Sequence, residues 1–309
     1  MEAIISLGTL LKRIEQNSGI VLISSIILGI LFSKYTRLMA PYIMYLLMGI
    51  LFIIFLKIDI GEILSHVKRP LLLSYILLMN LIITPLIVYL LVMPFRKDLV
   101  FGALLLASLP TGTAASAITE IIEGRTSLTL ILTILSTFLA MATIPSLFYF
   151  LLRTQINLDY LAMSLTLAKL ILIPLFLAQV AKLLFRNPIN KSKKHFGGIT
   201  VMLVAMIAMS VVGKEANYIF SNPRELIFYT LMLYFLFALF QIIGYFMVFW
   251  LKKDEKIAVS ASKAVMNNTL GIVLAASFFS SGVTLFLVLT ELPWITMPVI
   301  FKSLKRYFP

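Results

Sequence analysis

The sequence contains no cysteine among its 309 residues, which excludes disulfides, thiolate metal sites and thiol chemistry. Charge is also scarce, since Asp, Glu, Lys and Arg make up 13% of the chain, against about 25% in an ordinary soluble domain. Hydrophobic residues make up 61%, which leaves too little polar surface to cover a water-soluble globule. The composition therefore excludes a soluble enzyme and indicates a membrane protein.

The apolar residues fall into ten runs, each bounded by charged or turn residues. Because a spanning helix needs about 20 apolar residues, ten helices fill the chain and predict a single all-α membrane domain over residues 1–309. The first 17 residues lack the apolar run of a signal peptide, and we expect a short interfacial helix there. The runs are 18–33, 40–56, 70–93, 99–122, 128–151, 160–184, 198–213, 226–251, 257–279 and 282–301.

Basic residues outnumber acidic ones by 26 to 13, which in a soluble chain would suggest nucleic acid. Here they lie mostly in loops, with 17 on the side that carries both termini and seven on the other. The two remaining lysines, Lys169 and Lys263, fall inside runs. This bias predicts that both termini are cytoplasmic and that no nucleic acid binds.

A weak internal repeat appears when the two halves are aligned with an offset of 157 residues, so that residues 124–133 lie on 281–290. The repeated units cover about 18–151 and 160–301. Five spans repeated once place the second copy upside down in the bilayer, because an odd number of crossings ends on the other side. Inverted repeats of this kind are typical of secondary transporters.

Two runs contain helix-breaking residues at corresponding places of the repeat. Pro110 and Gly112 interrupt the fourth run, and Asn267, Asn268 and Gly271 interrupt the ninth. Proline lacks an amide hydrogen, and Gly and Asn are poor helix formers, so both runs are suited to local unwinding. Either break alone often means only a bend, but the pair predicts broken helices whose half-helix ends hold ions near the midplane.

Four motifs resemble the bile acid:sodium symporter family. They are Pro-x-Gly-Thr-Ala from Pro110, Gly-x-x-x-Leu-Thr-x-x-x-Thr-x-x-Ser-Thr from Gly124, Asn-x-x-x-x-Pro from Asn80 and Met-Asn-Asn-x-x-Gly from Met266. The resemblance implies a panel of spans 1, 2, 6 and 7, and a core of spans 3–5 and 8–10 in which broken helices 4 and 9 cross. It also implies alternating-access transport of organic anions, such as bile acids or small carboxylates, in the plasma membrane of a bacterium or archaeon.

The resemblance further implies where coupling ions would bind. In sodium-coupled members, spans 4, 5 and 9 hold one sodium ion and spans 3 and 9 a second, with one span 9 glutamate serving both. Carried over residue by residue, that glutamate corresponds to Lys263. The first site corresponds to Ala115, Ser116, Thr129, Thr133 and Lys263, and the second to Asn80, Lys263, Asn267 and the carbonyls of Ala264 and Met266.

A lysine in this position replaces attraction for a cation with repulsion. Two unit charges about 4 Å apart interact by roughly 4 kcal/mol at an effective dielectric near 20, so sodium should not compete there. We expect no metal and no cofactor. We expect the Lys263 ammonium to donate hydrogen bonds to the Thr129 and Thr133 hydroxyls, the Asn267 side chain and free carbonyls. The alternative is that Lys263 extends to the membrane surface.

Five further residues are candidates for substrate binding or coupling. Thr113, Asn268 and Thr269 lie at the two breaks. Glu291, near the middle of the tenth run, is expected to pair with Lys263, or to be protonated and bonded to backbone near Pro293. Lys169 would attract an anion into an outward cavity, or reach the outer headgroups.

These features predict a secondary active transporter of organic anions in which Lys263 replaces the sodium ions. Proton coupling through Lys263 is left open, because a buried lysine can release its proton. The alternative is a conventional sodium:organic anion symporter with rearranged ligands. An intramembrane enzyme is disfavoured, since only Lys263 and Glu291 would supply a reactive pair, and a receptor would not need paired breaks. The expected partners are the organic anion and membrane lipids.

Overall fold

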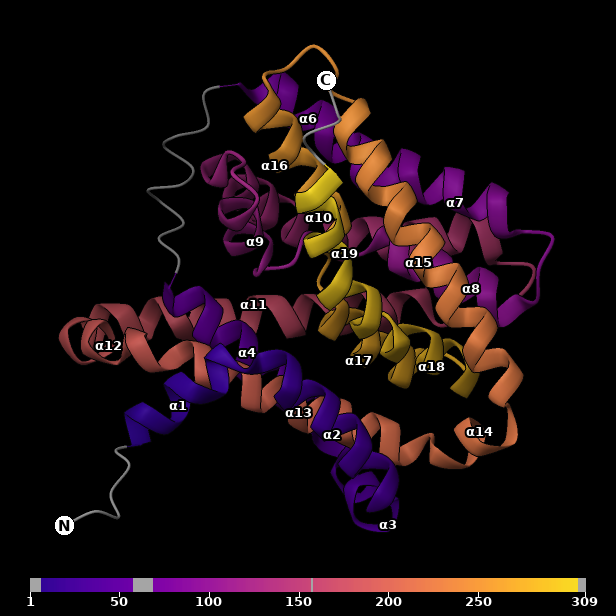
Figure 1. The fold of residues 1–309 in the computed structure, drawn as a ribbon, viewed down its shortest axis with the longest axis horizontal. Coiled ribbons are helices and arrows are strands. Elements are labelled where there is room, and N and C mark those ends of the chain that lie inside the picture. The colour runs from indigo at the N-terminus through magenta and orange to yellow at the C-terminus, as the bar shows by residue number, and fades with distance from the viewer. Residues whose placement is uncertain (1–6, 58–68, 157, 305–309) are drawn as a thin grey trace. The chain divides into compact units, whose positions relative to one another are not determined.

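The computed structural model describes residues 7–57, 69–156 and 158–304 (Figure 1). Over these residues the fold is all-helical, as predicted, and the only β-type pairing is one isolated bridge between Thr111 and Met266. Among the described residues, seven helices are long and apolar enough to cross a membrane. The bent pair α1 (Leu7–Gln16) and α2 (Ser18–Leu31), which meet at 87°, is an eighth candidate. The count of ten spans stays a prediction, because the helices of the fourth and ninth runs are too short to qualify singly.

The chain divides into two compact units, residues 1–59 with 166–220 and residues 60–165 with 221–309. In the first unit, the central helix α13 contacts α1, α2 and α4. Gly29 of α2 permits this packing, since an added Cβ would lie 2.7 Å from the Met209 carbonyl oxygen of α13. After α1 and α2, the helices of this unit are α3 (Ser33–Thr36), η1 (Arg37–Tyr42), α4 (Ile43–Lys57), most of α11 (Tyr160–Leu184), α12 (Arg186–Ser192), η3 (Lys193–His195), α13 (Phe196–Lys214) and α14 (Ala216–Ser221).

The second unit contains both predicted breaks. Helix α8 ends at Ser108 before α9 begins at Ala115, and α16 ends at Ala264 before α17 begins at Asn268. The helices of this unit are α6 (Pro70–Leu78), the π-helical turn η2 (Met79–Ile83), α7 (Thr84–Val92), α8 (Lys97–Ser108), α9 (Ala115–Ile121), α10 (Thr126–Leu152), α15 (Pro223–Phe246), α16 (Lys253–Ala264), α17 (Asn268–Phe278), α18 (Ser281–Leu289) and α19 (Glu291–Leu304).

Contacts within the second unit come in pairs. Helix α8 contacts α7 and α18, while α16 contacts α15 and α10. Similarly, α9 contacts α10, while α17 contacts α18. An offset of 157 residues places α8 on α16, α9 within α17 and the start of α10 on α18. The helices that correspond in the aligned halves therefore have corresponding neighbours.

Candidate functional site

The two helix breaks meet directly, joined by backbone hydrogen bonds. The Gly112 amide donates to the Val265 carbonyl at 2.7 Å, and the Asn267 amide donates to the Pro110 carbonyl at 2.9 Å, around the antiparallel Thr111 to Met266 bridge. Backbone unwound inside a bilayer must find partners, and each break supplies them to the other. Glycine is required at 112, because a Cβ there would lie 2.6 Å from the Met266 carbonyl oxygen.

Side chains hold the same crossing. The Thr111 hydroxyl donates to the Ser262 carbonyl at 2.7 Å, and the Thr111 amide donates to the Ser136 hydroxyl at 3.1 Å. At the start of α17, the Asn267 side chain accepts the Leu270 amide hydrogen at 3.2 Å, as an N-cap does. The crossing is thus fixed from α10, α16 and α17 together.

Next to the crossing, η2 leaves the Asn80 carbonyl without a backbone donor. In an α-helix that carbonyl would accept the Thr84 amide hydrogen, but this amide donates to the Met79 carbonyl instead. The next donor along the chain would be residue 85, which is proline and has no amide hydrogen. The Asn-x-x-x-x-Pro motif therefore produces a free carbonyl oxygen in the middle of a span.

The end of α8 leaves a second carbonyl free in the same way. The Ala107 carbonyl would accept an amide hydrogen from residue 110 or 111. Residue 110 is proline, and the Thr111 amide donates to the Ser136 hydroxyl. Both free carbonyls thus arise beside a proline that the sequence motifs contain.

The ammonium of Lys263 occupies the position between these two carbonyls. Its Nζ donates to the Asn80 carbonyl at 2.9 Å and to the Ala107 carbonyl at 2.6 Å, and lies 5.0 Å from the ring centre of Phe240. Lys263 is only 2% exposed, so it does not extend to the membrane surface. Because α16 ends at the next residue, the charge also lies at the negative end of that half-helix.

The side chains predicted to surround the ammonium bond elsewhere. The Thr129 hydroxyl lies 3.0 Å from the Thr119 hydroxyl and donates to the Ala258 carbonyl, and the Thr133 hydroxyl donates to the Thr129 carbonyl at 2.9 Å. Asn267 caps α17. The expectation that these three side chains bind Lys263 is therefore wrong, since the charge instead polarises carbonyls that prolines leave free. The carbonyls that the ammonium contacts are those of Asn80 and Ala107, not those of Ala264 and Met266.

The predicted pair of Lys263 with Glu291 is also not formed, since none of the ion pairs within 4.0 Å among the described residues joins them. Glu291 starts α19 and is 5% exposed. The desolvation of a lysine is here offset by two carbonyls and an aromatic ring, so it needs no carboxylate. Lys169 is an exposed residue of α11 in the other unit.

The remaining candidates lie at the breaks with different exposure. Ala115, Ala264 and Met266 are buried. Thr113, Ser116 and Thr269 are partly exposed, and the Ser116 hydroxyl donates to the Thr113 carbonyl at 3.3 Å. Asn268 is 4% exposed and neither polar atom of its side chain has a partner within the described chain. The Asn80 side-chain oxygen is likewise buried without a partner there.

Two features were not foreseen from the sequence. Ser136 belongs to the motif that starts at Gly124, but no role of its own was predicted for it. Its hydroxyl accepts the Thr111 amide hydrogen, which leaves the Ala107 carbonyl without a backbone donor.

The second feature is an ion-pair cluster that links the start of α16 to its neighbours. Glu255 accepts from Arg69 and Arg125, and Arg125 also pairs with Asp254 at 3.0 Å. Loop charges were used only to predict orientation. The internal repeat could have indicated this cluster, because it aligns Glu255 with another acidic residue near the start of a helix. Asp98, which corresponds to Glu255, similarly accepts from Ser280 at 2.7 Å.

In the ranges that the structure describes, no group of three or more His, Asp or Glu side chains is placed to hold a metal ion. An all-helical apolar chain with two crossed helix breaks and a buried cation between them defines a membrane transporter of the broken-helix type. The chain belongs to the Sodium Bile acid symporter family, whose sequence model matches residues 43–222, more than half of its length. It is a multi-pass transporter and not an enzyme.

Curated relatives support this assignment. The chain is 24% identical over 274 residues to the uncharacterized sodium-dependent transporter YocS of Bacillus subtilis, covering 86% of this chain and 83% of YocS. It is also 24% identical over 185 residues to the probable chloroplastic sodium/metabolite cotransporter BASS1 of Arabidopsis thaliana. That match covers 59% of this chain and 45% of the relative. The likeness to YocS therefore extends over most of both chains, whereas the likeness to BASS1 is partial.

Proposed function

We propose that the protein is a secondary active transporter of organic anions that works by alternating access without sodium at its crossing. One observation carries the proposal: the Lys263 ammonium donates to two backbone carbonyls that would otherwise be free. Carbonyl oxygens are ligands for sodium as well as acceptors for lysine. A cation attached to the chain therefore satisfies acceptors that a mobile cation would satisfy.

The electrostatics favour lysine over sodium at this position. A sodium ion placed beside Lys263 would meet a like charge in a region with little solvent. At an effective dielectric near 20 and about 4 Å, that repulsion is roughly 4 kcal/mol, about a thousandfold in affinity. Sodium binding would require Lys263 to lose its proton or move away.

The polar groups at the breaks offer a site for the carboxylate of the substrate. Thr113 and Thr269 are partly exposed, and Asn268 keeps both a donor and an acceptor without partners in the described chain. Buried unpaired amides are costly, and a ligand that bonds to them removes that cost. The family resemblance suggests bile-acid-like molecules or small carboxylates as substrates.

The panel-and-core arrangement belongs to the same proposal. The first compact unit comprises most of the predicted panel, and the second comprises the predicted core with both broken helices. The paired contacts within the second unit support inverted repeats over about 18–151 and 160–301. Alternating access by rigid-body movement requires a panel and a core that are each compact on their own.

A conventional sodium symporter is the second candidate, because the named relatives are described as sodium-dependent or as sodium/metabolite cotransporters. The test is uptake of a panel of organic anions into proteoliposomes under separate sodium and proton gradients. We expect uptake by the unaltered protein to proceed equally with sodium or potassium outside. A sodium requirement in the unaltered protein would overturn the tethered-cation proposal and favour the symporter.

A charge reversal sharpens this test. Lys263→Glu restores a carboxylate at the shared position, and we expect it to make uptake depend on sodium. Lys34→Glu is the matched control, because Lys34 is exposed on α3 and the change in charge is the same. If a proton gradient drives the unaltered protein, Lys263→Ala should abolish that dependence. Sodium-independent uptake by Lys263→Glu would show that residue 263 does not set the coupling.

A further inference from the structure

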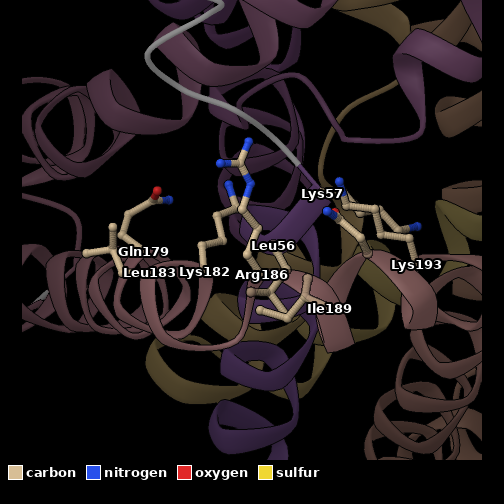
Figure 2. A pocket seen from close by; sticks show the side chains of 9 residues that line it. Leu56, Lys57, Gln179, Lys182, Leu183, Arg186, Ile189 and Lys193 are labelled. Carbon is tan, nitrogen blue, oxygen red and sulfur yellow. The ribbon is translucent and has the colours of Figure 1, made fainter.

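The first compact unit contains a pocket of about 560 Å³ whose lining is strongly basic. Lys57 at the end of α4, Lys182 at the end of α11, Arg186 of α12 and Lys193 of η3 all line it. Figure 2 shows Lys57 and Lys193 on one side, Gln179 and Leu183 on the other, and Lys182 and Arg186 between them. No acidic side chain of the described ranges is part of the lining, although Glu15 of α1 acts electrostatically on Lys57.

A second observation points to a bound ligand. Gln179 lines the same pocket, and its side-chain amide nitrogen is buried without a hydrogen-bond partner in the described chain. Four cationic groups and an unpaired N–H donor around one hollow match the acceptor oxygens of a phosphate group. Transport does not use this pocket in the proposal above, since every broken-helix residue lies in the other unit.

The surroundings of the pocket favour a lipid phosphate over a soluble one. Leu183, in the lining, is 85% exposed, and Leu184 and Phe185 beside it are exposed as well. Large apolar side chains exposed next to a cationic hollow suit acyl chains beside a charged headgroup. The pocket is formed by the ends of the second and sixth apolar runs and by the segment after the sixth, which the loop charges predict to lie on the cytoplasmic side. Anionic lipids give the cytoplasmic leaflet its negative surface potential.

We propose that this pocket binds the headgroup of an anionic phospholipid of the cytoplasmic leaflet. The phosphate lies among Lys57, Lys182, Arg186 and Lys193, with the Gln179 amide as a neutral donor. The acyl chains lie over Leu183 and its exposed neighbours. Such a lipid bridges α4, α11 and α12, and so stabilises the first unit without entering the transport site.

The experiment is a titration of the purified full-length chain in neutral detergent with dioctanoyl phosphatidylglycerol, followed by native mass spectrometry. Dioctanoyl phosphatidylcholine has the same chains and a phosphate but no net charge, and inorganic phosphate has no chains. Arg186→Gln with Lys193→Gln removes two pocket charges. Lys191→Gln with Lys194→Gln removes two charges from the same segment but outside the lining. Lys193→Gln alone serves if the double variant does not fold.

We expect phosphatidylglycerol to bind the unaltered protein and the Lys191/Lys194 variant alike, and to bind the Arg186/Lys193 variant about tenfold or more weakly. Phosphatidylcholine should bind all three equally weakly. Equal loss of affinity in the two double variants would overturn the proposal, since it would show attraction to overall charge. Inorganic phosphate binding as tightly as phosphatidylglycerol would overturn the lipid assignment and indicate a soluble phosphate ligand.

Discussion

At the scale of single residues, the Lys263 ammonium is the donor on which two buried carbonyls depend. Lys263→Met keeps the length of the side chain and removes this donor. Each acceptor left unsatisfied costs about 1–3 kcal/mol, and the relief of burying a charge offsets part of that cost. We expect a net loss of about 1–3 kcal/mol in stability, measured as a lower midpoint of thermal unfolding in detergent.

The control for this substitution is Lys34→Met, which removes an exposed lysine and should change stability by about 0.5 kcal/mol or less. Equal midpoints for the two variants would mean that the carbonyls of Asn80 and Ala107 find other donors. In that case the ammonium would not stabilise the crossing.

Gly112 is the second residue whose substitution has a sharp expectation. Gly112→Ala places a Cβ 2.6 Å from the Met266 carbonyl oxygen, and backbone cannot move aside as a flexible side chain can. We expect it to separate the crossed segments, lower stability by about 1–3 kcal/mol and strongly reduce uptake.

The matched control is Gly49→Ala in α4, where the nearest atom to an added Cβ is a Leu203 methyl carbon at 3.6 Å, an ordinary contact. Because Gly in a helix costs about 1 kcal/mol relative to Ala, this variant should be neutral or slightly more stable. Uptake by Gly112→Ala at the rate of Gly49→Ala would argue against a tight crossing.

At the scale of elements, proline determines where the helices leave carbonyls free. Pro85→Ala supplies an amide hydrogen in π-helical register with the Asn80 carbonyl, so that carbonyl depends less on Lys263. We expect Lys263→Met to cost about 1 kcal/mol less in the Pro85→Ala background than alone. A double-mutant cycle on unfolding free energies measures this coupling.

Pro174→Ala is the control background, since Pro174 lies within α11 in the other unit. Its combination with Lys263→Met should be additive within about 0.5 kcal/mol. Additivity for Pro85→Ala as well would show that the proline does not create the dependence of Asn80 on the ammonium.

The elements also show what a sequence can and cannot predict. Pro110 and Gly112 indicated the first break, and Asn267 with Asn268 indicated the second. These predictions were possible because a missing amide hydrogen or a weak helix former disrupts the helix at its own position. Free carbonyls were expected as partners of Lys263, but the two that it contacts, those of Asn80 and Ala107, were not identified. Every residue has a carbonyl, and only the diversion of the Thr84 and Thr111 amides makes these two available. That diversion depends on η2 and Ser136, which single-residue chemistry does not reveal.

Glu291 shows the same limit, because here the sequence predicted a contact that the structure does not contain. Pairing a buried lysine with a nearby carboxylate is sound reasoning about charge, yet depth along a helix says nothing about which side of that helix a residue faces. The relative placement of α16 and α19 decides the contact, and it follows from how each of them packs against α15. The basic pocket was missed similarly, since its lysines looked like ordinary orientation signals.

At the scale of the whole molecule, the absence of cysteine allows a direct test of orientation. We expect Ser192→Cys, after the sixth apolar run, to react only with reagents on the cytoplasmic side. Ser221→Cys, after the seventh run, should react only from outside, because one span lies between the two positions. Both serines are exposed, and labelling of intact cells with a membrane-impermeant maleimide distinguishes the two sides.

The unaltered chain gives the background for this measurement, and it should show no labelling because it has no thiol. Reaction of Ser192→Cys from outside, with protection of Ser221→Cys, would reverse the assigned orientation. It would also move the basic pocket to the outer leaflet.

The bridge between Thr111 and Met266 bears on how the nascent protein matures at the ribosome. The unwound stretch after α8 enters the bilayer long before the segment that pairs with it is synthesised, since some 155 residues separate Thr111 from Met266. At about 5–20 residues per second, that interval is on the order of ten seconds or more. During it, several amides and carbonyls face lipid or an insertion chaperone. Early termination before residue 265 should therefore leave a product that quality-control proteases remove quickly.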